Sequence, residues 1–242
     1  MVKKNKYQVF LILILNMISN HKSENLMEDL AKKLQLYVIT DSKLIDNIGI
    51  PIANAVEEAI LGGATIIQLR EKNISFDEYL QKALVVKQIT DKYGIPLIIN
   101  DNTDVAVACD ADGVHLGQDD ESIQIAKQKL KPDKIIGISA NTLQEAIDAE
   151  KSGASYLGID TPFSTQTKRD AKFSTLENMI KICSSVKIPC VAIGGINKNN
   201  ITDILKTGIA GTAVISSIFG DKNVKKNTLL LKQKIEIGLE KK

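Results

Sequence analysis

The feature that most constrains the fold of this chain is a regular alternation, beginning at Leu36, of short apolar runs with longer amphipathic segments. The runs are four to six residues long and are rich in Ile, Val and Leu. This pattern is typical of repeated strand–helix units that build a parallel sheet. Eight such runs occur, at residues 36–40, 65–70, 96–100, 113–116, 135–139, 155–159, 190–194 and 211–216.

Eight strands favour a closed barrel. Between them we expect helices that include residues 54–61, 76–93, 142–151, 175–186 and 200–206. Glycine, which commonly ends a helix, follows several of these segments: Gly62, Gly94, Gly153 and Gly208. The 242 residues also match the usual size of one α/β barrel. The sequence therefore predicts an α/β protein with the (β/α)8 TIM barrel fold.

A doubly wound open sheet is the alternative fold. In such sheets the first strand is commonly followed by a glycine-rich turn. Here Thr40-Asp41-Ser42 stands at that place. In a barrel, functional residues gather where the strands end and the next loops begin. The polar residues of this chain gather at those positions.

The first 33 residues are expected to form an N-terminal extension, followed by the barrel domain at residues 34–242. Three lysines precede an apolar stretch at residues 9–15, which resembles the start of a signal peptide. The stretch is too short to span a bilayer, and no small-residue cleavage site follows it. An added helix, a poorly ordered tail and an upstream start codon, with true initiation at Met17 or Met27, remain open.

Composition limits the partners of the protein. The net charge is only +2 and the lysines are scattered, so nothing favours nucleic acid, and no membrane partner is expected. The three cysteines, Cys109, Cys183 and Cys190, are odd in number and lack close metal-ligand spacing, as in reduced cytoplasmic proteins. We expect a cytoplasmic protein with small-molecule substrates and leave a homo-oligomer open.

The second apolar run changes character at its end. Thr65 to Ile67 is apolar, whereas the following residues are Gln68, Leu69, Arg70, Glu71 and Lys72. On an extended backbone Arg70 and Lys72 project to the same side, with Gln68 below them. This predicts a binding site for an anion, either phosphate or carboxylate. The alternative is that charges stand at a strand end simply because they meet water.

Acidic residues follow the third and fourth runs. Asp101 lies in the segment Asn100 to Asp104, and Asp120 ends the segment Gly117 to Asp120. Carboxylates at adjacent strand ends could share Mg2+, which prefers a few carboxylates plus substrate phosphate. Helix capping by Asp or Asn is the alternative.

The later strand ends carry hydroxyls, cations and glycines. Ser139 could donate to a phosphate, whereas Thr142 with Glu145 fits a capping box and is expected to be structural. The loop at residues 161–170 is long and rich in hydroxyls and cations, as functional loops commonly are. Gly194-Gly195 and Ile215-Ser216 stand where such barrels commonly bind phosphate, although glycine could serve a tight turn alone.

Six motifs follow one another along the chain: LYVITD at residues 36–41, QLREK at 68–72, IND at 99–101, GVHLGQDD at 113–120, TQTKRDA at 165–171 and AIGGI at 192–196. Together they resemble the thiamine phosphate synthase family, also called thiamine-phosphate pyrophosphorylases. The resemblance covers about residues 36–219, and the N-terminal extension lies outside it.

The resemblance implies a (β/α)8 barrel transferase of thiamine biosynthesis with Mg2+ as cofactor. It would join a pyrimidine diphosphate to a thiazole phosphate, forming thiamine phosphate and releasing pyrophosphate. By motif, Asp101 and Asp120 would bind the metal, and Arg70, Lys72 and Lys168 would be catalytic. The implied substrate-binding residues are Gln68, Leu69, Arg70, Glu71, Lys72, Asn100, Ser139, Thr165, Gln166, Thr167, Lys168, Gly195, Ile215 and Ser216.

One segment departs from the family pattern. The family has Gly-Pro-apolar-Phe-Pro-Thr before its Thr-Lys, whereas this chain has Asp160-Thr161-Pro162-Phe163-Ser164-Thr165. The change puts thiazole binding in question more than diphosphate binding. A thiazole tautomerase on the same barrel and a non-catalytic binder of thiamine precursors are the alternative functions. The retained charges at Arg70, Lys72, Asp101 and Asp120 argue against the tautomerase, and His115 needs no acid–base role.

Overall fold

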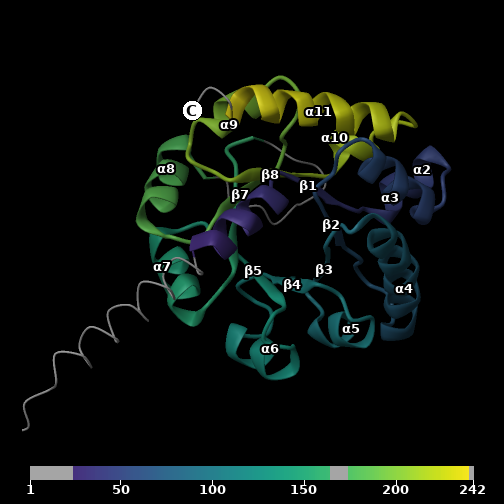
Figure 1. Ribbon diagram of the computed structural model, residues 1–242, viewed down its shortest axis with the longest axis horizontal. Helices are drawn as coiled ribbons and strands as arrows, with labels where there is room; N and C mark the ends of the chain where they lie inside the picture. The colour runs from purple at the N-terminus through teal and green to yellow at the C-terminus, as the bar shows by residue number, and fades with distance from the viewer. Residues whose placement is uncertain (1–23, 164–173, 240–242) are drawn as a thin grey trace, which may run out of the picture.

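The computed structural model describes residues 24–163 and 174–239. Eight parallel strands form a closed barrel in which each strand pairs with its neighbours in sequence and β8 pairs with β1. The fold is therefore the predicted (β/α)8 barrel, and the open-sheet alternative is wrong (Figure 1). The strands are β1 (Leu36–Ile39), β2 (Ile66–Leu69), β3 (Leu97–Asn100), β4 (Gly113–Leu116), β5 (Ile135–Ser139), β6 (Tyr156–Asp160), β7 (Cys190–Ile193) and β8 (Gly211–Val214).

Helices surround the barrel on its outer side (Figure 1). They are α2 (Ser42–Ile48), α3 (Ile52–Leu61), α4 (Phe76–Tyr93), α5 (Thr103–Ala108), α6 (Ile123–Lys129), α7 (Leu143–Ser152), α8 (Leu176–Ser185), α9 (Ile201–Leu205), α10 (Ser216–Phe219) and α11 (Val224–Leu239). The expected strands and helices are all present, with ends that differ by at most two residues.

Capping residues determine where several helices begin and end. Thr142 accepts a hydrogen bond from the N–H of Glu145, whose side chain accepts one from the N–H of Thr142, so the predicted capping box is confirmed. Gly94 and Gly153 end α4 and α7 in the left-handed conformation, where glycine carries no Cβ penalty.

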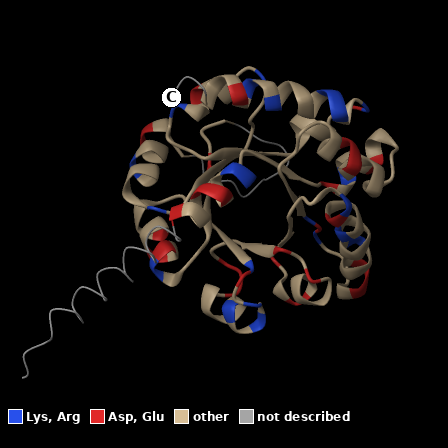
Figure 2. Ribbon diagram, in the orientation of Figure 1, with Lys and Arg blue, Asp and Glu red and all other residues tan. Residues whose placement is uncertain are grey.

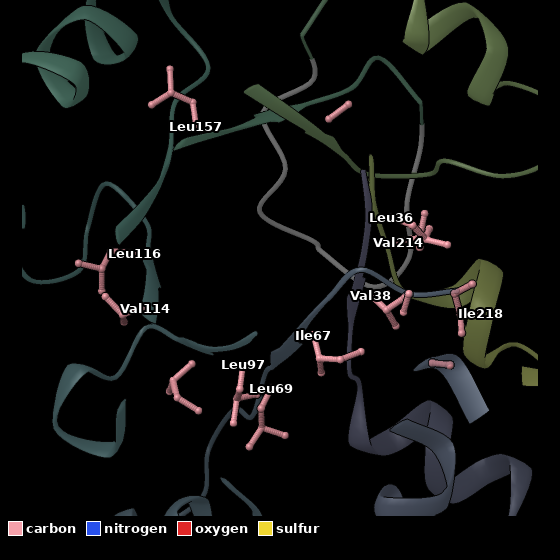
Figure 3. Close-up of a cluster of buried hydrophobic side chains, with 14 of the residues drawn as sticks. Leu36, Val38, Ile67, Leu69, Leu97, Val114, Leu116, Leu157, Val214 and Ile218 are labelled. Carbon is pink, nitrogen blue, oxygen red and sulfur yellow. The ribbon is translucent and has the colours of Figure 1, made fainter. Parts of the chain in front are cut away.

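The strands separate two apolar layers because successive side chains point to opposite faces. Leu36, Val38, Ile67 and Leu69 belong to the large cluster between the barrel and the helices (Figure 3). Tyr37, Ile39, Ile66, Ile98, Tyr156, Val191, Ala213 and Ile215 belong to a smaller cluster associated with the barrel interior. The period of two in the sequence thus decides which residues can reach the inside of the barrel.

Residues 24–33 are helical and lead into β1. In Figure 1 this purple segment lies across the barrel opening, and Leu30 and Leu34 pack against the interior cluster. Part of the predicted N-terminal extension therefore covers the end of the barrel where β1 begins. The proposed boundary at residue 33 stays a prediction, and residues 1–23 lie outside the described part of the chain.

The surface charges show no single stripe: Lys and Arg alternate with Asp and Glu over the outer helices (Figure 2). Among the residues that the structure describes, no helix is both long enough and apolar enough to cross a membrane. Cys109 and Cys190 are buried, Cys183 is partly buried, and none of the three forms a disulfide bond within the described residues.

We predict that Gly211→Ala destabilises the barrel at the seam between β8 and β1. A Cβ atom at residue 211 would lie 1.9 Å from the carbonyl oxygen of Leu34 and 2.6 Å from Cα of Gln35, both main-chain atoms. Urea unfolding should show a loss of about 2 kcal/mol or more in the free energy of unfolding, as for overpacked sites.

Gly49→Ala is the matched control for this replacement. Gly49 has φ +70° and no atom within 4 Å of the added Cβ, so only backbone strain of about 1 kcal/mol is expected. Equal losses in the two variants would contradict the assigned close approach at Gly211.

Candidate active site

A cavity of about 250 Å3 opens where the barrel strands end. Every strand contributes at least one side chain to its wall, so the site is a product of barrel closure and of no single segment. The sequence-predicted site residues that line it are Gln68, Arg70, Lys72, Asn100, Asp101, Asp120, Ser139 and Ile215.

The end of β2 delivers alternate residues to the cavity. Gln68, Arg70 and Lys72 line it, as the strand period predicts, whereas Leu69 and Glu71 do not. Leu69 packs in the outer cluster (Figure 3). Glu71 accepts a hydrogen bond from Ser42 of α2 and pairs with Lys82 of α4 at 3.1 Å. Substrate contacts by Leu69 and Glu71 therefore stay predictions, and their side chains face the helices.

Arg70 is held at the rim by the end of β1. Its main-chain N–H donates to Thr40 Oγ1 at 3.1 Å, and its Nη1 lies 3.5 Å from Asp41 Oδ2. Asp41 also caps α2, accepting from the N–H of Leu44 at 3.1 Å. Because Asp41 is held by the helix start, it orients the guanidinium beside the cavity and leaves its remaining N–H groups able to bind an anion.

Asp101 and Asp120 meet at the ends of β3 and β4. The N–H of Asp101 donates to the carbonyl oxygen of His115 at 2.8 Å, and its φ is +62°, a left-handed conformation that Asp tolerates better than most residues. Asp120 accepts from the N–H of Gly117 at 2.6 Å. Main-chain contacts thus aim both carboxyl groups at one place.

The pKa of Asp101 is raised to about 6. Burial is the largest cause, followed by a hydrogen bond with Asp120 and repulsion from its charge; Lys72 and Arg70 act in the opposite direction. Two carboxyl groups this close cannot both ionise without cost, and a cation between them would remove that cost.

This donor set fits a divalent cation with oxygen ligands. Within residues 24–163 and 174–239, no group of three or more His, Cys, Asp or Glu side chains could hold a metal ion. A pair of carboxylates is nevertheless what Mg2+ commonly takes from a protein when substrate phosphates supply further ligands. Asp101 and Asp120 are therefore the residues that could hold such an ion.

Behind the rim, five side chains form a chain of hydrogen bonds across the barrel. Gln68 Nε2 donates to the Tyr37 hydroxyl at 2.8 Å, which lies 2.8 Å from the Tyr156 hydroxyl. The Tyr156 hydroxyl lies 3.0 Å from His115 Nδ1, and His115 Nε2 lies 3.0 Å from Ser139 Oγ. Tyr37 and Tyr156 were not predicted as site residues from the sequence. Their signal was a hydroxyl-bearing ring in an apolar strand, because a buried Tyr usually finds a partner.

The end of β6 carries the departure from the family pattern. Asp160 is buried and lines the cavity; its Oδ2 accepts from Asn141 Nδ2, and its N–H donates to Asn141 Oδ1, each at 2.8 Å. Thr161 donates its hydroxyl to the carbonyl oxygen of Gly194. Asn141, which was also not predicted from the sequence, therefore holds the Asp160 carboxylate on the wall of the cavity.

Gly195 and Ser216 are not among the residues that line this cavity, although Ile215 is. Thr165, Gln166, Thr167 and Lys168 lie outside the described residues. The roles assigned to all of these residues stay predictions.

Comparisons with known proteins agree on one family. A family model described as thiamine monophosphate synthase matches residues 36–218. The thiamine-phosphate synthase of Clostridium tetani is 48% identical over 191 residues, covering 79% of this chain and 90% of the relative. That of Persephonella marina is 46% identical over 203 residues, covering 84% and 96%.

A solved structure gives the same result. The thiamine phosphate pyrophosphorylase of Pyrococcus furiosus superimposes with a TM-score of 0.79 and is 46% identical to this chain. The match covers 87% of this chain and 99% of that one.

We predict that Asp101 lowers stability as the pH rises, in protein free of divalent cations. Folded Asp101 has a pKa of about 6 against 3.8 for an ordinary Asp, so between these values the folded state holds a proton that the unfolded chain loses. The contribution of Asp101 to the free energy of unfolding therefore falls across this window. Asp101→Asn should raise the urea midpoint at pH 7, with the gain shrinking by pH 4.

Asp110→Asn is the control, with the opposite sign. Hydrogen bonds from Lys134 and Lys131 lower the pKa of Asp110 to about 2, so its contribution is present at pH 7 and is lost as the pH falls toward 2. Asp110→Asn should leave stability unchanged or slightly lower at pH 7. A lower midpoint for Asp101→Asn at pH 7 would contradict the assignment.

Proposed function

Because this chain belongs to the thiamine monophosphate synthase family, we propose that it condenses a pyrimidine diphosphate with a thiazole phosphate to give thiamine phosphate and pyrophosphate. The first substrate is 4-amino-2-methyl-5-(diphosphooxymethyl)pyrimidine. The second is 4-methyl-5-(2-phosphoethyl)thiazole or its carboxylated form. The chain is thus a transferase of thiamine biosynthesis, and the resemblance of its six motifs to this family is confirmed.

The chemistry is supported by one observation: the same cavity holds two cations from the end of one strand and two acids from the ends of the next two strands. Arg70 and Lys72 come from β2, whereas Asp101 and Asp120 follow β3 and β4. A diphosphate needs cationic groups and, commonly, Mg2+ to neutralise its charge. This set can therefore bind the diphosphate along its whole length.

Charge development supports the roles of these residues. Breaking the bond between the pyrimidine methylene carbon and the diphosphate oxygen leaves the bonding electrons on oxygen. Arg70 and Lys72 then interact more strongly with the leaving group than with the intact substrate, which lowers the barrier. Lys168, which lies outside the described residues, is proposed as the third cation.

Mg2+, when bound by Asp101 and Asp120, supplies further positive charge to the diphosphate. The reaction needs no protein nucleophile, because the thiazole nitrogen attacks the electron-poor methylene carbon. The apolar side of the cavity, which includes Ile39, Ile193 and Ala213, excludes water that would compete for this carbon. Positioning and electrostatics supply the rate.

The second substrate occupies the opposite part of the site in this proposal. Ile215 on the cavity wall, with Ser216 next to it and Gly195 two residues after the cavity residue Ile193, would hold the thiazole phosphate together with Thr165, Gln166 and Thr167. Gln68, Asn100 and Ser139 line the half assigned to the pyrimidine. Leu69 and Glu71 would act through their main chain, because their side chains face the helix layer.

The relatives reported above support the synthase and neither alternative function. A cytoplasmic location remains part of the proposal, in keeping with three cysteines that form no disulfide bond within the described residues, and a homo-oligomer stays open.

We predict that pyrophosphate is released only when both substrates and Mg2+ are present. A coupled pyrophosphate assay, with each substrate omitted in turn and with EDTA, measures this directly. Interconversion of thiazole forms without pyrophosphate would favour the tautomerase instead. Tight binding of both substrates without turnover would favour the non-catalytic binder.

We predict that Asp101→Asn lowers kcat at least about 100-fold at low Mg2+, because a metal-binding carboxylate is lost. Higher Mg2+ should restore part of the rate. Asp110→Asn is a close control, because Asp110 has φ +50° and thus shares the left-handed backbone of Asp101, which has φ +62°. An unchanged rate for Asp101→Asn at low Mg2+ would exclude the metal role.

A further inference from the structure

The hydrogen-bond chain from Gln68 to Ser139 connects two residues assigned to the pyrimidine half of the site. Its three inner members, Tyr37, Tyr156 and His115, have no assigned role. Tyr37 is 1% exposed and Tyr156 0% exposed, so both hydroxyls depend on partners inside the barrel. A buried polar chain is costly unless every member is satisfied, and a fully satisfied chain fixes one arrangement.

The strands leave room for these rings. A Cβ atom at Gly137 of β5 would lie 2.1 Å from Tyr156 Cζ, and one at Gly158 of β6 would lie 3.0 Å from His115 Cε1. Strand interiors disfavour glycine, which packs no side chain there. The two glycines therefore leave the space that the rings of Tyr156 and His115 occupy inside the barrel.

Counting the hydrogens that each side chain can donate shows which atom is the donor in each hydrogen bond of this series. Gln68 Nε2 donates to the Tyr37 hydroxyl, so the one proton of Tyr37 is satisfied only if it is donated to Tyr156. A buried donor without an acceptor would otherwise remain. Tyr156 in turn donates its proton to His115 Nδ1.

The same count assigns the donor and acceptor roles of His115 and Ser139. Neutral His115 that accepts at Nδ1 carries its proton on Nε2 and donates it to Ser139 Oγ. The Ser139 hydroxyl donates no hydrogen bond within the described part of the chain, so its proton is available to a molecule in the cavity. At the other end, Gln68 donates one of the two hydrogens on Nε2 to Tyr37, and its amide oxygen remains able to accept.

We propose that Tyr37, Tyr156 and His115 are positioning residues that set the hydrogen-bonding polarity of the site, with Gln68 as acceptor and Ser139 as donor. This polarity fits an aminopyrimidine, whose amino group donates and whose ring nitrogen accepts. An oxo analogue would present an acceptor to the amide oxygen of Gln68 in place of the amino donor. The inference rests on the proposed function for the identity of the ligand, but the polarity is a property of the protein alone.

The tautomer of His115 tests this polarity without substrate. The chain has two histidines, His21 and His115, so a His21→Gln variant assigns the 15N signals of His115 unambiguously. At pH 8 we expect the ring proton on Nε2, with Nδ1 unprotonated. Tyr156→Phe removes the donor to Nδ1 and should populate the other tautomer. A ring proton on Nδ1 in the unmodified chain would overturn the proposal.

Steady-state kinetics test the positioning role. Tyr156→Phe retains the ring and should lower kcat/KM for the pyrimidine diphosphate about tenfold, the effect of one buried hydrogen bond. If the residue acts through Ser139, the same replacement in a Ser139→Ala background should change kcat/KM less than about twofold. Additive losses would show that Tyr156 does not act through Ser139 and would overturn the role.

Tyr93→Phe is the matched control, because its hydroxyl donates to Glu57 at 2.7 Å in the helix layer, away from the cavity. It should leave kcat/KM unchanged. If Tyr156→Phe fails to fold, Tyr37→Phe makes the same test at the next member of the chain. His115→Gln, which keeps a donor and an acceptor, should retain more activity than His115→Leu; equal losses would overturn the role of His115.

The outcomes separate this inference from the proposed function. If the unmodified protein releases no pyrophosphate, the proposed function fails. The tautomer of His115 then still tests the proposed donor and acceptor roles. If turnover is normal and the tautomer is reversed, the polarity fails and the function stands.

Discussion

The structure depends on the side-chain period of two along eight parallel strands that close on themselves. Closure removes every exposed sheet edge and forces each strand residue to face either the helices or the barrel interior. In β2, Ile67 and Leu69 face the helices, whereas Ile66 and Gln68 face inward. A shift of one residue in this strand would exchange the two sets. The core and the functional cavity are thus set by the same alternation.

The same alternation decides which charged side chains face the cavity and which face the helices. Beyond the last residue of β2, the alternation continues through Arg70 and Lys72 on the cavity side and Glu71 on the helix side. Glu71 is satisfied by Lys82, so the acid between the two cations does not cancel their charge at the cavity. At the neighbouring strand ends, burial and then the nearby carboxyl group of Asp120 raise the pKa of Asp101 to about 6. The site therefore holds carboxyl groups in an arrangement that is costly in the absence of a cation, and such arrangements are common where function requires them.

Two tyrosines inside the barrel contribute both to the apolar core and to the hydrogen bonds of the site. Tyr37 and Tyr156 belong to the same interior cluster as Ile66, Ile98 and Val191, and their rings serve as core. Their hydroxyls join Gln68 to Ser139, so residues from β2 and β5 are linked through the centre of the barrel and not only around its rim. Packing of the core and orientation of the binding groups therefore cannot be altered independently.

The sequence by itself determined the strand order, the barrel and the residues that stand at the strand ends, because apolar periodicity and strand-end polarity are local patterns. It also determined the family, through six motifs that extend over most of the chain. It did not reveal α11, although Val224, Thr228, Leu231 and Ile235 are buried at helical spacing. Short helices such as α5 and α10 span too few residues for periodicity to show.

Only the tertiary structure decided which strand-end residues share a cavity, because that depends on closure of the barrel. It separated Leu69 and Glu71 from Gln68, Arg70 and Lys72, and it brought Asp160 against Asn141, 19 residues away in sequence. It also joined Tyr37 to Tyr156, which are 119 residues apart. A hydrogen bond between side chains on different strands requires both the register and the inward direction of each strand, and a linear sequence encodes that pairing only through the completed fold.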